Sequence, residues 1–157
     1  MLVLQHANVI IIGKRRLIYT KMRKLYLSKN LNLDDKKVKL VSDFCVFCAS
    51  SLPVKKDFEI YVVNDRSSHD ISTTAVYHLG RNVVKVYAKN RALVDVCRSI
   101  AHEMTHMMQD ESGLIDGPVQ DAGGFHEDQA NAKAGELIKL FAKSDNDRKA
   151  IYEIKYI

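Results

Sequence analysis

The sequence predicts an α+β domain in which a small, mostly antiparallel sheet packs against helices. Three short runs rich in β-branched and aromatic residues follow one another at 58–64, 73–79 and 83–88. Apolar residues recur with the helical period before and after these runs, over 33–51 and again from 91 to 112. With 157 residues, 46% hydrophobic and 27% charged, the chain has the size and composition of one globular domain.

Positive charge dominates the start of the chain. No acidic residue precedes Asp34, whereas seven basic residues do. They are Lys14, Arg15, Arg16, Lys21, Arg23, Lys24 and Lys29. We therefore divide the chain into a basic N-terminal arm, 1–32, and a folded domain, 33–157. Residues 14–29 can attract nucleic acid, an acidic protein surface or anionic lipid, and an acid-poor arm also resembles a transit peptide; a solvated cationic extension is the simplest interpretation.

The first elements are expected in the following order. β-Branched residues interrupted by Gly13 favour a short strand or hairpin near the start, although a helix over 17–27 fits as well. The amphipathic helix over 33–51 has polar capping residues at 32–35, and Pro53 ends it.

The second half of the chain alternates turns and helices. A hairpin turn at 80–82 joins the last two strand-like runs. Asn90 is expected to cap a second helix that continues to Gly113. A glycine-containing loop then leads to a third helix over 125–143, and the apolar tail at 151–157 fits a last strand or a docked helical turn.

Residues 102–106 of the second helix read H-E-M-T-H. Residues four apart lie on the same face of a helix, so His102 and His106 can present ring nitrogens to one metal ion. Glu103 points about 100° away around the helix, where it is placed to act as a general base on solvent. The spacing therefore predicts two zinc ligands and a catalytic carboxylate.

A catalytic zinc site needs a third protein ligand. Glu127, which opens the third helix, is the first candidate, and Asp116 and Asp121 in the preceding loop are alternatives. The metzincin pattern is excluded because Gln109 and Ser112 occupy the positions of its glycine and third histidine.

H-E-M-T-H together with F-H-E-D-Q-A-N resembles the gluzincin metallopeptidases, among them the thermolysin-like group and small intracellular anti-repressor peptidases. In that family H-E-x-x-H is paired with a later helix bearing E-x-x-[small]-[D/N]. The resemblance covers residues 102–106 and 126–131, and the order of elements over 58–142. It implies a zincin-like fold, a minimal gluzincin domain, in which Glu127 is the third zinc ligand and Asn131 orients a ligand histidine. Asparagine, in place of the thermolysin-like aspartate, would orient the ring without adding negative charge.

The resemblance implies a zinc endopeptidase with one zinc ion. Zinc lowers the pKa of a bound water to about 7, and Glu103 would take its proton and pass it to the leaving amine. The alternative is a zincin fold that serves as a structural or binding component of a larger assembly and docks through its basic arm. Glu103 favours the enzyme, since a structural metal site has no use for a base beside its ligands.

The resemblance also implies a histidine or tyrosine outside the motif that stabilises the oxyanion. The candidates are Tyr77, His78, His126 and Tyr152. It further implies an edge strand that binds the substrate backbone, and the run at 73–79 is our candidate. Arg81 and Lys85 beside it would favour acidic substrates, unless they are ordinary solvated charges.

The remaining sulfur-containing residues are expected in the core. Cys45 and Cys48 have C-x-x-C spacing but no second pair, so burial on a helix face is favoured over a zinc knuckle, and Cys97 is assigned to the core as well. The three methionines of the second helix have core spacing and need no copper site to explain them: Met104, Met107 and Met108. An odd cysteine count, the absence of a secretory signal and the absence of an apolar run of about 18 residues favour a cytoplasmic or otherwise intracellular protein without a membrane span.

Overall fold

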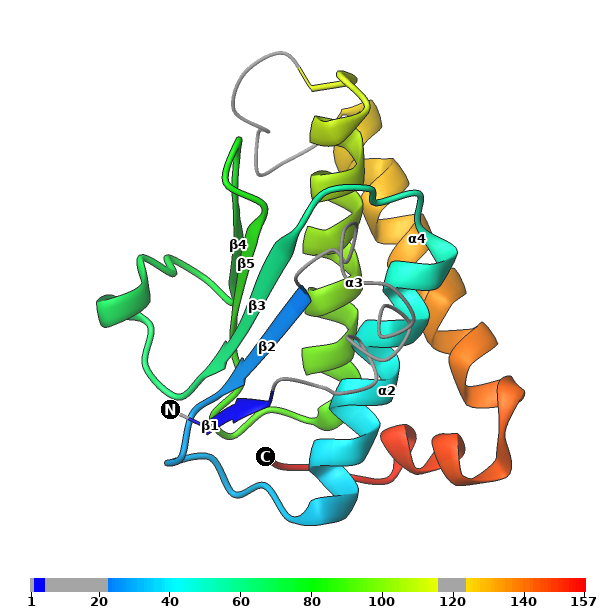
Figure 1. Cartoon of the computed structure of the whole chain (residues 1–157). Helices are drawn as coiled ribbons and strands as arrows, with labels where there is room; N and C mark the ends of the chain where they lie inside the picture. The colour runs from blue at the N-terminus through cyan, green and yellow to red at the C-terminus, as the bar shows by residue number, and fades with distance from the viewer. Residues whose placement is uncertain (1, 5–22, 116–123) are drawn as a thin grey trace, which may run out of the picture.

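The computed structural model describes residues 2–4, 23–115 and 124–157. A five-stranded sheet has its long helices packed on one side (Figure 1), and the strand order is β1-β2-β3-β5-β4. The strands are β1 (Leu2–Leu4), β2 (Arg23–Leu27), β3 (Phe58–Val63), β4 (Ala75–His78) and β5 (Val83–Tyr87). The α+β class is therefore confirmed.

The sheet is mixed. Strand β1 pairs antiparallel with β2, and β4 pairs antiparallel with β5, but β2–β3 and β3–β5 are parallel. The prediction of a mostly antiparallel sheet was wrong in this respect. The reason is that helix α2 (Asp35–Ser51) connects β2 to β3 as a crossover, and a crossover of this kind returns the chain in the same direction.

Strand β2 comes from the segment predicted as a basic arm. Its Leu25 and Leu27 are 3% and 0% exposed, and Leu25 is in register with Ile60 of β3. The helix considered over 17–27 is wrong for 23–27, where the chain is extended, while the antiparallel β1–β2 pair agrees with the hairpin alternative. Residues 14–22, which form most of the basic segment 14–29 that could attract a partner, lie outside the described residues.

The predicted N-terminal cap is confirmed at one helix and wrong at the next. Helix α2 begins as predicted, because the Asp34 carboxylate accepts a hydrogen bond from the Lys37 N–H at 2.8 Å. Helix α3 (Leu93–Glu111) does not begin at the predicted cap. Asn90 instead adopts a left-handed conformation with φ 58°, and Ala92 occupies the cap position without a side-chain hydrogen bond. Gly113, at φ 71°, follows the end of the helix.

Helix α4 (Phe125–Ser144) runs antiparallel to α3, and a 3₁₀ helix, η2 (Asn146–Tyr152), follows it (Figure 1). The tail forms a helical turn, not a last strand. Its final residues dock on the start of α3, where the Leu93 N–H donates to the Ile154 carbonyl at 3.0 Å. A second 3₁₀ helix, η1 (Ser67–His69), connects β3 to β4.

Helix α3 is the centre of the core, in contact with α2, α4, β4 and β5. The predicted core methionines Met104 and Met107 are fully buried, and Met108 is 9% exposed. A helix held on several sides is a rigid support for the side chains it presents. Within the described ranges, no helix has both the length and the apolar character that crossing a bilayer requires.

Candidate metal centre

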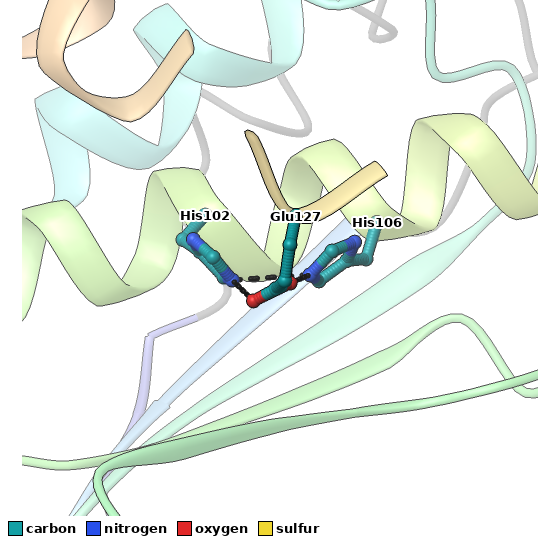
Figure 2. Close-up of side chains that lie close together, drawn as sticks. All are labelled: His102, His106 and Glu127. Atoms are coloured by element: carbon teal, nitrogen blue, oxygen red, sulfur yellow. Dashed lines mark hydrogen bonds and ion pairs between the residues drawn. The ribbon is translucent and has the colours of Figure 1, made fainter. Parts of the chain in front are cut away.

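Three side chains from two helices meet beside the sheet. His102 and His106 come from α3, and Glu127 comes from the first turn of α4 (Figure 2). The two Nε2 atoms are 3.0 Å apart, and each lies 2.9 Å from a different oxygen of the Glu127 carboxylate. One ligand-type atom from each residue lies within 4.8 Å of the others, so the group can hold a metal ion.

Local helix geometry explains this arrangement. The two histidines are one helical turn apart, so both rings project from the same face of α3. Glu127 reaches them because α4 begins beside the second half of α3 and runs back along it (Figure 1). The fully buried side chains of α4 near this turn, Ala130 and Ala134, are small and permit close approach of the two helices.

The environment of the group favours metal binding. Burial lowers the pKa of His102 below its usual value, although the Glu127 carboxylate and a side-chain hydrogen bond with Asn131 oppose that shift. Glu127 Oε2 is shielded from solvent and accepts no hydrogen bond from the described residues, even though His106 Nε2 is 2.9 Å away. That contact is thus close enough for an ion pair but does not have hydrogen-bond geometry, which leaves a carboxylate oxygen suited to a cation.

Each histidine has a neighbour that orients it. Asn131, one turn beyond Glu127, makes the side-chain hydrogen bond with His102. Gln109 Oε1 lies 2.8 Å from His106 Nδ1. From the sequence, Gln109 was noted only as a departure from the metzincin pattern, and its contact with His106 was not predicted. The signal was its position three residues after His106, on the same helix face.

A cavity of about 210 Å³ opens beside this group. Glu103 lines it together with the two histidines and Glu127. The opposite wall comes from β4 and the residues flanking it, among them Thr73, Ala75, Tyr77 and Leu79. Because β4 is the last strand in the sheet order, one of its backbone edges has no strand partner among the described elements.

Of the four predicted oxyanion stabilisers, only Tyr77 lines this cavity. Its hydroxyl donates to Asp110 Oδ2 at 2.5 Å and lies 3.3 Å from Asn82 Oδ1. The Gly80 N–H also donates to Asp110 Oδ2, at 2.9 Å. The Tyr77 hydroxyl therefore connects β4 to α3 and is already engaged by a carboxylate.

The other three candidates lie elsewhere. Successive side chains of a strand point to opposite faces, so His78 lies on the outer face of the sheet, in a hollow of about 260 Å³ that Arg81 and Lys85 also line. Burial lowers the pKa of His78, and the positive charges of Lys85 and Arg81 lower it further. The His126 ring packs edge-on against Phe125. Tyr152 lies in η2, beyond the opposite end of α4, and is 51% exposed.

The other predicted features are placed as follows. Arg81 and Lys85 line the outer hollow and not the cavity beside the candidate metal centre. The three cysteines are free and buried, and burial raises the pKa of Cys45 to about 12. In the part of the chain that the structure describes, His102, His106 and Glu127 are the only group with metal-ligand geometry. The alternative ligands Asp116 and Asp121 lie outside that part.

The chain matches no family model, no curated protein and no solved structure in the comparisons made. The function of the site is therefore inferred from its own geometry.

Proposed function

We propose that the protein is a zinc-dependent metallopeptidase in which His102, His106 and Glu127 hold the metal and Glu103 is the general base. The observation that carries the proposal is the convergence of two imidazole nitrogens and a carboxylate, with ligand-type atoms within 4.8 Å, beside a cavity that Glu103 also lines. Two histidines and one glutamate are a ligand set of catalytic zinc sites, which keep one further position open.

The electrostatics of the group fit a divalent cation. With neutral imidazoles, the three residues carry one negative charge and direct lone pairs toward a common point. Lone pairs at 2.9–3.0 Å repel one another unless a proton or a cation lies among them. The same donor set also suits ferrous iron, so metal analysis should include iron. A carboxylate immediately after the first ligand favours hydrolytic zinc.

The chain's own residues suggest how a peptide bond would be cleaved. Zinc, when bound, polarises the substrate carbonyl and makes water nucleophilic at neutral pH. The Glu103 carboxylate would accept the proton of the attacking water and then deliver it to the nitrogen of the leaving amine. Strand β4 offers its backbone edge to an extended peptide, which would place the scissile bond in the cavity.

The first experiment compares the purified protein with Glu103→Gln, measuring metal content and cleavage of a peptide library. We expect the variant to keep its zinc and to lose turnover, since the amide cannot accept a proton. Glu136→Gln is the matched control, because its side chain is 53% exposed on α4. Equal cleavage by the native protein and by Glu103→Gln would remove the catalytic assignment.

The second experiment tests the ligands. His106→Ala and Glu127→Ala should release the metal, because two remaining ligands hold zinc weakly. If Glu127→Ala retains a full equivalent of zinc, Asp116 or Asp121 supplies the third ligand and the assignment of Glu127 is wrong.

A further inference from the structure

We infer that Gln109 is a positioning residue that sets the tautomer of His106 and ties both ligand-bearing helices together at the metal centre. The inference concerns the metal site that underlies the proposed function, and so rests on it for its biological purpose. Its structural content is independent of any metal.

The Gln109 side chain is fully buried, and each of its polar atoms is engaged. Its Oε1 lies 2.8 Å from His106 Nδ1. Its Nε2 donates to the His126 carbonyl at 3.1 Å and to Gln129 Oε1 at 2.8 Å. Both amide hydrogens are thus donated, and the oxygen faces the ligand histidine.

The His126 carbonyl decides which way the amide of Gln109 points. A carbonyl can only accept a hydrogen bond, so the NH₂ group must face His126 and the oxygen must face His106. Since that oxygen can only accept, His106 Nδ1 must carry the hydrogen. In the neutral ring, the lone pair is then on Nε2, the atom 2.9 Å from Glu127 Oε2. Gln109 therefore leaves the imidazole ready to bind a metal.

The same amide links the ligands of the two helices. The His126 carbonyl directly precedes Glu127 in the chain, and Gln129 lies two residues after it. One buried side chain of α3 thus contacts His106 and two residues of α4 that lie close to Glu127 in the chain, His126 and Gln129. Glutamate lacks the two donors, and methionine lacks donors and has only a weak acceptor, so neither can make all three contacts.

The test uses the full chain and two readouts. In the metal-free protein, imidazole ¹H–¹⁵N correlation spectra report the tautomer of His106. Competition against a chromophoric chelator then reports zinc affinity. We expect an Nδ1–H tautomer in the native protein. In Gln109→Met, which keeps the approximate shape, we expect a shift to Nε2–H and a zinc affinity lower by about 10–100-fold.

Two further variants separate the tautomer from the linkage. Gln109→Glu keeps an acceptor for His106 Nδ1 but loses both donors, so we expect it to restore the Nδ1–H tautomer. It should do so without restoring full zinc affinity. Glu136→Gln is the matched control, because that side chain is 53% exposed on α4 and makes none of the contacts of Gln109. We expect it to keep the native tautomer and a zinc affinity within about threefold.

The outcomes that overturn the inference are distinct from those that overturn the proposed function. The inference fails if Gln109→Met keeps the Nδ1–H tautomer, or if the native protein shows Nε2–H at His106. If Gln109→Met does not fold, the spectrum of Gln109→Glu decides, since an Nε2–H ring there contradicts the assigned acceptor. Absence of zinc binding by the native protein would remove the proposed function, while the spectra of the metal-free protein would still decide the role of Gln109.

Discussion

Replacing Tyr77 with phenylalanine separates two roles for its hydroxyl. If Tyr77 stabilises an oxyanion, its loss lowers turnover and leaves stability almost unchanged. If the hydroxyl connects β4 to α3, as its 2.5 Å contact with Asp110 indicates, its loss lowers stability first. The structure favours the second role, because a hydroxyl has one hydrogen to donate and Asp110 receives it.

The magnitude follows from the contacts of Asp110. A hydrogen bond to a charged group contributes about 1.5–3 kcal/mol to folding stability. The Asp110 carboxylate keeps the Gly80 N–H after the substitution, and the site is partly exposed, so we take the lower end, about 1.5 kcal/mol. For a chain of this length, that corresponds to a fall in Tm of roughly 3–6 °C.

The assay combines urea unfolding with peptide cleavage on the same preparations. We expect Tyr77→Phe to show a lower midpoint with an unchanged m value, and turnover within about threefold of native once folded protein is compared. Tyr152→Phe is the control, because that side chain is 51% exposed and its loss should change stability by less than about 0.5 kcal/mol. Native stability in Tyr77→Phe with turnover lowered by about 100-fold would refute the reasoning and make Tyr77 an oxyanion donor.

The remaining predictions concern pH, the core, the cysteines and the metal. Burial, and after it the interaction with Asp110, raises the pKa of the Tyr77 phenol. Folding stability should therefore fall as the pH rises above the unfolded pKa of about 10, and it should fall less in Tyr77→Phe. Urea unfolding at alkaline pH tests this, and the same pH dependence in both proteins would contradict it. Phe141 is fully buried, and its ring packs edge-on against that of Phe44, with 5.1 Å between the ring centroids. Phe141→Ala should therefore lower the free energy of unfolding in urea by about 3–5 kcal/mol. A loss below about 1 kcal/mol would show that the core repacks. Burial raises the pKa of Cys45 to about 12, and the other two thiols are buried too. A thiol reagent should therefore label the three cysteines slowly in the native state and promptly in urea. Rapid labelling of the native protein would be inconsistent with their burial. Zinc at about 100 times its Kd should stabilise the native protein by about 2.7 kcal/mol, which corresponds to a Tm increase of roughly 5–11 °C. The same Tm increase in Glu127→Ala would exclude Glu127 as a zinc ligand.

Local patterns predicted the elements well. The runs at 58–64, 73–79 and 83–88 correspond to β3, β4 and β5, and the helical periods correspond to α2, α3 and α4. These succeed because hydrophobic periodicity reports the face that each segment buries. Asn90 failed as a helix cap because it adopts a left-handed conformation two residues before the cap position, and its backbone N–H donates to the Ile157 carbonyl at 3.4 Å.

Long-range relations could not be read in the same way. The order of strands, and the parallel pairing of β2 with β3, depend on which segments meet after the chain folds. The place of Leu25 and Leu27 in the core was hidden by the basic residues around them. Likewise, the pleat fixes only that Tyr77 and His78 point to opposite faces of the sheet, and the packing of the sheet on α3 decides that Tyr77 is the one that lines the cavity.

The sequence by itself determined that His102 and His106 face one point, because both are on one helix and backbone geometry sets their spacing. The approach of Glu127 was implied by resemblance and depends on how α4 packs along α3. The contacts of Gln109 and the engagement of the Tyr77 hydroxyl were decided by tertiary structure alone. A hydrogen bond between distant segments exists only where packing brings a donor and an acceptor within about 3 Å, and no local pattern in the chain records that distance.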